Sequence, residues 1–131
     1  LVLFGRGQFG ILYSGQTPPT LKDVASYESK IPQAYFTDSV AGDLNSDGQS
    51  DIVILDLRTH QVEILNFQEQ AGLKHALNFK VFEEKTFSRS NRSGSDPREA
   101  VIADLTGDNR KDLILLCHDR VLLYPQDDGK K

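Results

Sequence analysis

The sequence predicts an all-β protein made of repeated four-stranded antiparallel sheets. Three observations lead to this fold class. An acidic loop followed by an apolar strand occurs twice at a constant spacing. Short apolar strands and polar turns alternate along the chain, as expected of antiparallel sheets. The 3.6-residue periodicity of an amphipathic helix is weak throughout, so we do not expect helices to build the core.

The repeat is clearest in two segments, VAGDLNSDGQSDIVIL (residues 40–55) and VIADLTGDNRKDLILL (residues 101–116). They align without a gap at an offset of 61 residues, and both carry three aspartates at the same positions. The apolar runs DIVIL and DLILL have no polar face, which predicts strands buried on both sides. The opening residues have the form of the same strand pair, with Leu1 in the place of Ile52 and Leu113.

Each unit is expected to contain a strand leading into the acidic loop, an apolar strand, a turn, a hairpin partner and an outer strand of mixed polarity. We assign the outer strand to SYESKI (residues 26–31) and VFEEKTF (residues 81–87). Residues 20–27 and 67–77 have a weak helical pattern, and we interpret both as loops or short turns. Residues 88–97 are rich in Ser, Arg, Gly and Pro, which predicts an exposed loop insertion.

Four-stranded units that recur about every 50 to 60 residues are typical of β-propeller blades. On this interpretation residues 1–131 form one propeller segment, with a partial blade (1–38), a full blade (39–99) and a second partial blade (100–131). About two blades cannot close a ring, because propellers have about four to eight. We therefore expect either self-association that completes a ring or a parent chain with more blades. The chain contains no methionine, which indicates that it is a piece of something longer.

The first acidic loop has the spacing of a cation site. The oxygen-bearing residues at its odd-numbered positions, 1 to 9, are Asp43, Asn45, Asp47, Gln49 and Asp51. Gln49 would contribute its backbone carbonyl. Groups at alternate positions of a tight turn converge, and about six to eight hard oxygen ligands suit Ca²⁺. Gly48 permits the left-handed backbone that such a loop needs, and the loop has no His or Cys to favour softer metals.

The second acidic loop repeats these positions as Asp104, Thr106, Asp108, Arg110 and Asp112. Asn109 replaces Gly48, and because asparagine tolerates a left-handed conformation we expect the same loop shape. Thr106 replaces an asparagine, and Arg110 and Lys111 add positive charge, so calcium affinity is expected to be lower. The alternative is a solvated turn rich in Asp and Asn, which explains single acids better than the same three acids at one spacing twice.

The segments DLNSDGQSDIVIL and DLTGDNRKDLILL resemble the FG-GAP/VCBS repeats of integrin-type β-propellers and of many secreted bacterial proteins. Blades of this family carry a D-x-[DN]-x-D-G-x-x-D calcium loop between their first two strands. The first loop matches every specified position, and the second departs at Thr106 and Asn109. The resemblance implies a calcium-binding scaffold of a secreted or cell-surface protein. The non-catalytic part of a secreted polysaccharide-active enzyme, a lyase or hydrolase with its active site outside this chain, is the alternative.

Composition argues against several functions. The net charge is -4, and 15 Lys and Arg residues are scattered among 19 acids, so a nucleic-acid partner is not expected. No apolar run approaches the ~20 residues of a transmembrane helix, so membrane insertion is not expected either. The expected partner is a protein or carbohydrate ligand that the residues do not identify. Extracellular calcium would fill even a weak site, which favours an extracellular, periplasmic or cell-surface location.

No catalytic residues are predicted, and the chain is not expected to be an enzyme. The three histidines, His60, His75 and His118, fall in turns or polar connections. The serines between residues 88 and 95 belong to the loop insertion. Glu83 and Glu84 are neighbours on an expected strand, so they would point to opposite faces and could not act as a pair. Cys117 has no partner for an internal disulfide and is expected as a buried apolar side chain.

Overall fold

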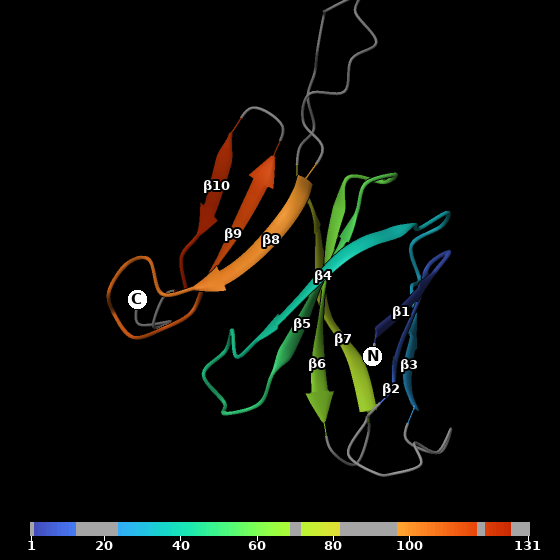
Figure 1. Ribbon diagram of the computed structural model, residues 1–131, viewed down its shortest axis with the longest axis horizontal. Coiled ribbons are helices and arrows are strands. Elements are labelled where there is room, and N and C mark those ends of the chain that lie inside the picture. Colours follow the sequence, from blue (N-terminus) through green and yellow to red (C-terminus); the bar gives the residue numbers. More distant parts are fainter. Residues whose placement is uncertain (1, 13–23, 69–71, 82–96, 118–119, 127–131) are drawn as a thin grey trace, which may run out of the picture.

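A computed structural model describes residues 2–12, 24–68, 72–81, 97–117 and 120–126. These residues form ten strands in three antiparallel sheets, and no helix (Figure 1). The predicted fold class is confirmed: the protein is all-β, its complete sheet has four antiparallel strands, and the described sheets do not close into a ring. The described residues contain no helix that is long and apolar enough to cross a membrane.

Each sheet is a meander of strands that are consecutive in the chain. The first sheet contains β1 (Val2–Gly5), β2 (Gln8–Leu12) and β3 (Val24–Glu28). The second sheet contains β4 (Phe36–Gly42), β5 (Asp51–Asp56), β6 (Gln61–Gln68) and β7 (Gly72–Lys80). The third sheet contains β8 (Pro97–Ala103), β9 (Asp112–Cys117) and β10 (Val121–Tyr124). The second and third sheets thus begin at residues 36 and 97, where the units expected from the sequence begin at 39 and 100.

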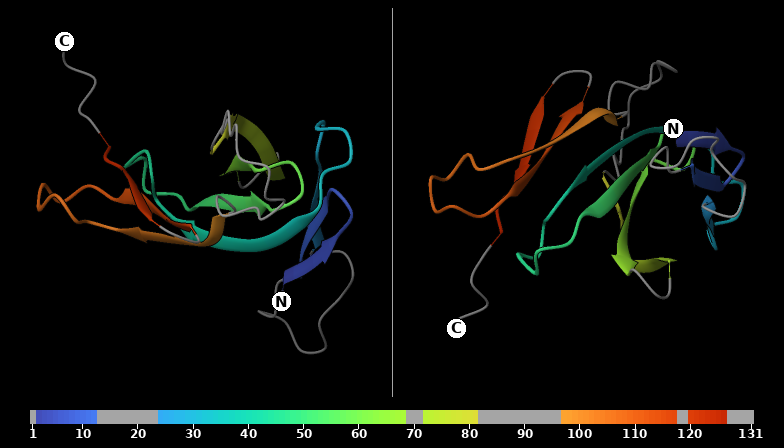
Figure 2. Two further views of the ribbon diagram at one scale, coloured as in Figure 1. Left: turned by 90° about the horizontal axis from the view of Figure 1, so that it is seen from above. Right: turned by 60° about the horizontal axis from the view of Figure 1, so that its bottom comes forward.

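Strand β5 is buried on both faces, as predicted, and its two faces serve two different cores. Ile52 and Ile54 belong to a cluster with residues of the first sheet, such as Phe9. Val53 and Leu55 belong to a second cluster, which includes residues of the third sheet. Burial of each such side chain stabilises the fold by about 1.5–3 kcal/mol. The first and third sheets accordingly lie on opposite sides of the second (Figure 2).

The second and third sheets approach each other closely beside the acidic loops. A Cβ atom added to Gly42, the last residue of β4, would lie 2.8 Å from Cγ2 of Ile102 on β8. That distance is shorter than side-chain contacts allow, so the interface needs a glycine here. The equivalent residue before the second loop is Ala103. Cys117, predicted to be buried, is half-buried against the second cluster.

The outer strand of the complete sheet lies earlier in the chain than predicted. It is β7, which contains most of the segment 67–77 that we interpret from the sequence as a loop, and that interpretation is wrong. Residues 74–78 are all exposed, and the pairing with β6 is irregular after Ile64, so the alternation typical of a strand is missing. Residues 82–87, the remainder of the predicted outer strand, and residues 88–96 of the predicted insertion lie outside the described residues.

The first sheet shows the same shift. Residues 24–27, interpreted as part of a loop, belong to β3. The amide of Ser29 donates to the carbonyl of Gly7 (2.7 Å), and the amide of Val81 donates to that of His60 (2.9 Å). Gly7 directly precedes β2 and His60 directly precedes β6, so the two carbonyls occupy equivalent places after a hairpin turn. By these hydrogen bonds, Ser29 is the equivalent of Val81. The sequence patterns SYESKI and VFEEKTF align Ser26 with Val81 instead, which is three residues too early.

Candidate metal centre

The first acidic loop joins two neighbouring strands of the second sheet. β4 ends at Gly42 and β5 begins at Asp51, and these two residues are paired across the strands. The loop therefore leaves and re-enters the sheet at one point. In Figure 1 this loop and the equivalent loop between β8 and β9 lie on the same side of the molecule.

Side chains of the first loop turn inward onto its own backbone amides. Asp43 accepts hydrogen bonds from the amides of Asp47 (3.1 Å) and Gly48 (2.9 Å). The Oδ1 atom of Asn45 accepts from the same Asp47 amide (3.0 Å), and Asp47 accepts from the amide of Gln49 (2.8 Å). Because oxygens of Asp43 and Asn45 meet at one N–H group, the side chains at positions 1 and 3 converge on the loop interior.

Both loops have a left-handed backbone conformation at positions 4 and 6. In the first loop they are Ser46 (φ 61°) and Gly48 (φ 84°). In the second they are Gly107 (φ 77°) and Asn109 (φ 65°). The prediction for Gly48 and Asn109 is confirmed. The left-handed position 4 was not predicted, although Gly107 was a signal for it, because glycine adopts this conformation without steric cost.

The last acid of the first loop, Asp51, is buried, with 2% of its surface exposed. Its carboxylate accepts hydrogen bonds from the amide of Leu44 (3.0 Å) and from the side-chain amide of Asn66 on β6 (2.5 Å). Burial raises the pKa of Asp51, and the nearby negative charge of Asp47 adds to this effect. The charged form of Asp51 is therefore disfavoured in the folded protein without a cation.

The last acid of the second loop, Asp112, is also buried but is better compensated. Its carboxylate accepts three backbone amides, those of Leu105 (2.9 Å), Thr106 (3.1 Å) and Gln126 (3.1 Å). The hydrogen bond from Leu105, with smaller effects of Gln126 and Thr106, lowers the pKa of Asp112. The folded protein thus stabilises the charge of Asp112, whereas it disfavours that of Asp51.

Within the second loop, Asp104 takes the place of Asp43. It accepts the amides of Gly107 (2.6 Å) and Asn109 (2.9 Å). Asp108 accepts the backbone amide of Arg110 (2.9 Å) and forms an ion pair with its guanidinium, with Nε and Oδ2 3.0 Å apart. The backbone hydrogen bond, assisted by the guanidinium, lowers the pKa of Asp108. Arg110 thus supplies from within the chain a positive charge that the first loop lacks.

Gln126, which follows β10, connects the two loops. Its amide donates to Asp112 of the second loop (3.1 Å), and its side-chain oxygen accepts from the hydroxyl of Ser46 in the first (3.4 Å). This contact was not predicted, because Gln126 lies 80 residues from Ser46 and has no special pattern around it. The first loop therefore adjoins both the third sheet and its own.

The donor chemistry of the first loop fits a hard cation. It offers carboxylate, amide and carbonyl oxygens, and carboxylates that accept amide hydrogen bonds keep further lone pairs for a cation. In the part of the chain that the structure describes, no group of three or more His, Cys, Asp or Glu side chains is arranged to hold a metal ion. A calcium ion would therefore also need the oxygen of Asn45 and the backbone carbonyl of Gln49.

Outside the loops, the described residues contain two buried carboxylates that sequence analysis did not single out, Asp56 and Glu63. Glu63 on β6 has 1% of its surface exposed and accepts the hydroxyls of Tyr27 on β3 (2.7 Å) and of Ser29, the residue that follows β3 (2.5 Å). Burial and this carboxylate raise the pKa of Tyr27 above its usual range. The group links two sheets. His75, on β7, contacts the Asn78 side chain (3.1 Å). His118, Glu83, Glu84 and the serines between residues 88 and 95 lie outside the described residues.

Comparisons of the chain with protein families, with curated proteins and with solved structures found no match.

Proposed function

We propose that this chain is a calcium-binding segment of a β-propeller that acts as a structural and recognition scaffold in an exported protein. The observation that carries the proposal is the recurrence of one loop: three aspartates at positions 1, 5 and 9, on a backbone with left-handed residues at positions 4 and 6, appear twice 61 residues apart. A turn that merely contacts solvent would not require this combination of charge and conformation twice.

The charges of the first loop support calcium binding there more strongly than in the second. Asp43, Asp47 and Asp51 have no cationic side chain within their loop, whereas Asp108 has Arg110. A bound calcium ion would supply two positive charges beside these carboxylates and relieve the burial cost of Asp51. It would stabilise the connection between β4 and β5, the two strands that begin and end at the loop. The chain's own residues would contribute the ligands and the buried end of the site.

Thermal unfolding with calcium, with magnesium and with a chelator tests the proposal. At a calcium concentration about 100 times Kd, the stabilisation is about 2.7 kcal/mol, or a rise in Tm on the order of 10 °C. We expect Asp47→Ala to abolish most of this rise. Glu99→Gln, which removes an exposed charge outside both loops, should keep it. An equal rise with magnesium, or a full rise in Asp47→Ala, would contradict a calcium site in the first loop.

One face of the third sheet, exposed along β10, supports a second proposal, that a further sheet of the same kind packs there. Val121 (62% exposed) and Leu123 (45% exposed) on β10 lie opposite Leu116 and Ile114 on β9. The equivalent residues of the second sheet, by strand pairing, are Val62, Ile64, Leu55 and Val53. Those four belong to the cluster that packs on the third sheet. The third sheet therefore repeats the apolar surface by which the second sheet contacts its neighbour.

With this chain alone in solution, a second copy is the occupant that we propose, because the face matches a contact that the protein already makes within itself. Sedimentation over a range of concentrations should show association of the unmodified chain. Leu123→Lys should remove it. Leu77→Lys, at an exposed leucine on β7 (47% exposed), is the matched control and should not. A monomer at all concentrations, or equal effects of the two lysines, would contradict the proposal.

A further inference from the structure

The edge of the sheets opposite the acidic loops is basic. Strands β1 and β5 end there in hairpin turns. Among the residues that the structure describes, the exposed charged ones at that edge are six cations and two acids: Arg6, Lys30, Arg58, Lys80, Arg98, Arg120, Glu28 and Glu99. In contrast, the two loops at the other edge contain six aspartates with Arg110 and Lys111. The described residues therefore separate positive and negative charge strongly between the two edges of the sheets.

A cavity of about 350 Å³ lies at the basic edge, between the hairpin turn of the first sheet and that of the second. It is within the usual size range of small-ligand pockets. Arg6 enters it from the turn between β1 and β2, and Arg58 from the turn between β5 and β6. The other side chains that line it are Glu28, Ser29, Ile31, Gln33 and Ala34.

The connection between β3 and β4 (residues 29–35) forms the floor of this cavity and holds the turn of Arg6. The amide of Ser29 donates to the carbonyl of Gly7 (2.7 Å). A Cβ atom on Gly7 would lie 3.5 Å from that of Ala34, so the turn packs closely on the floor. The floor is itself closed by a hydrogen bond from the amide of Ala34 to the carbonyl of Ile31 (3.2 Å).

The same floor also holds the turn of Arg58, through the buried carboxylate of Asp56. One oxygen of Asp56 accepts the amides of Arg58 (2.8 Å) and Thr59 (2.9 Å). The other accepts the amide of Tyr35 (3.0 Å) at the end of the floor. Both arginines are thus carried by turns that hydrogen bonds attach to one segment, so their backbones are placed before any ligand arrives. Preorganisation of this kind lowers the entropic cost of binding.

Arg6 and Arg58 are both exposed residues, and among the described residues neither forms an ion pair. Two such cations repel each other, and an anion between them would relieve this repulsion. Guanidinium groups bind planar carboxylates through paired, charge-assisted hydrogen bonds. Glu28 and Gln33, which also line the cavity, can accept hydrogen bonds from hydroxyl groups. Ile31 and Ala34 offer a small apolar surface.

We propose that this cavity binds a carboxylate-bearing sugar, a uronate unit of an acidic glycan. One uronate ring presents the carboxylate that Arg6 and Arg58 require and the hydroxyl donors that Glu28 requires. An inorganic anion would satisfy the arginines but would place negative charge against Glu28 with no donor for it. The side chain of an acidic peptide has the same deficiency. The proposal does not depend on calcium binding, because the two sites lie at opposite edges.

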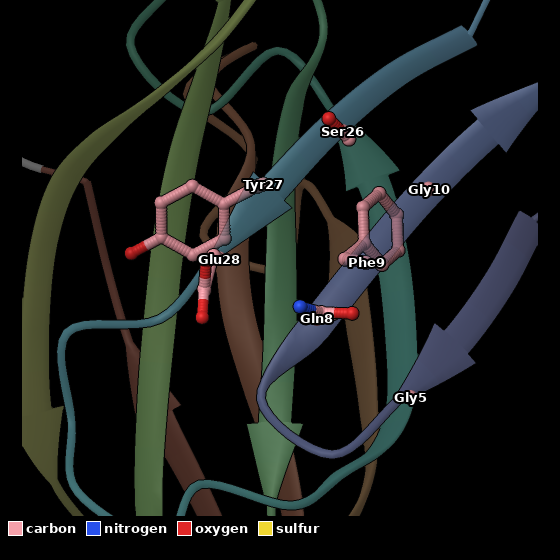
Figure 3. A pocket seen from close by; sticks show the side chains of 7 residues that line it. All are labelled: Gly5, Gln8, Phe9, Gly10, Ser26, Tyr27 and Glu28. Atoms are coloured by element: carbon pink, nitrogen blue, oxygen red, sulfur yellow. The ribbon is translucent and has the colours of Figure 1, made fainter.

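A second hollow, of about 380 Å³, lies on the first sheet and shares Glu28 with this cavity (Figure 3). Its lining has Phe9, Tyr27 and Gln8, and none of the described residues that line it carries a positive charge. It therefore lacks the feature that recognises a carboxylate, and the proposal is confined to the cavity between the turns.

The test is calorimetric titration of the folded chain in calcium with trigalacturonate, galactotriose, tri-aspartate and sulfate as probes. We expect trigalacturonate to bind, with affinity falling as salt rises, and the other three to bind at least about tenfold more weakly. Arg6→Gln and Arg58→Gln should each lower trigalacturonate affinity about tenfold. Lys30→Gln, at an exposed lysine of the same edge that does not line the cavity, should leave it unchanged.

Four results would overturn the proposal. Galactotriose binding as tightly as trigalacturonate would remove the role of the carboxylate. Tri-aspartate or sulfate binding as tightly would assign the cavity to acidic peptides or to simple anions. No binding of trigalacturonate by a folded chain would exclude the site. Binding lost in Asp47→Ala but kept in Arg58→Gln would place the sugar on calcium at the acidic loop, and would leave the calcium proposal standing.

Discussion

The two acidic loops share one backbone conformation, but they stabilise the negative charges of their aspartates in different ways. Each places left-handed residues at positions 4 and 6 and turns its first aspartate onto the loop amides. In the second loop Arg110 neutralises Asp108, and three backbone amides stabilise Asp112. The first loop contains no cationic side chain, and the hydrogen bonds that Asp51 accepts from Leu44 and Asn66 do not offset its burial.

This difference supports the proposal that the first loop binds a cation more strongly than the second. Burial raises the pKa of Asp51 and amide hydrogen bonds lower that of Asp112, although both are the last acid of their loop. The loop shape alone therefore does not decide how strongly a site binds calcium. We expect the charges and donors that the rest of the chain brings to each loop to influence calcium affinity as well.

The largest effect is expected from replacing the buried acid of the second loop. Asp112→Asn places an N–H₂ group against backbone amides that cannot turn away, and in chelator it should lower the free energy of unfolding by about 3 kcal/mol. Asp51→Asn should cost less than about 1 kcal/mol, because the side-chain amide of Asn66 can flip to accept. Denaturant unfolding measures both. Equal losses would mean that the two acids are not differently compensated.

The next effect concerns the residues before the loops. Gly42→Ala introduces a Cβ atom 2.8 Å from Ile102, and overpacking of this kind should cost about 1–3 kcal/mol. Ala103→Gly, at the equivalent position before the second loop, removes a Cβ atom instead. It should lower the free energy of unfolding by about 0.5–1 kcal/mol through backbone entropy. Thermal unfolding of both variants checks this. A stable Gly42→Ala chain would show that the sheets separate more easily than their contact indicates.

A smaller effect is expected from exchanging the residues at position 7, which is Gln49 in the first loop and Arg110 in the second. Arg110→Gln should strengthen calcium binding to the second loop, and Gln49→Arg should weaken it in the first. Each change should amount to about 0.5–1 kcal/mol, since both arginines are partly solvated. Calcium titrations of the two variants measure the shift in Kd. Unchanged affinities would exclude Arg110 as the cause of the difference.

The smallest effect is a difference in pH dependence. The pKa of Asp51 is raised, so without calcium its charged form lowers the free energy of unfolding at higher pH. As pH falls through the raised pKa toward the ordinary value of 3.8, Asp51 takes up a proton and this destabilisation is lost. Asp112, whose pKa is lowered, stabilises the protein above 3.8, and that contribution is lost as pH falls through the lowered value. Carbon NMR titration of the two carboxyl groups should give the higher midpoint for Asp51. The reverse order would contradict the comparison.

Much of this arrangement could be predicted from the sequence because the repeat is strong. The constant offset between the aspartates predicted the second and third sheets and the left-handed Gly48 and Asn109. The outer strand could not be found in this way, because Lys74 to Asn78 are all exposed and carry no alternation. Partners of the buried acids were missed for a different reason. Asn66, Gln126 and the Tyr27 hydroxyl are ordinary residues far along the chain, and only the folding of the sheets brings them to a carboxylate.

The central claim, that the first loop is the stronger of two calcium sites, is tested most directly by amide NMR during a calcium titration. The Gly48 amide donates to Asp43 and the Asn109 amide donates to Asp104, so each reports on the first acid of its loop. We predict that Gly48 shifts and saturates at a lower calcium concentration than Asn109, and that magnesium at the same concentration does neither. Absence of a saturable shift at Gly48, or equal responses to calcium and magnesium, would contradict the account.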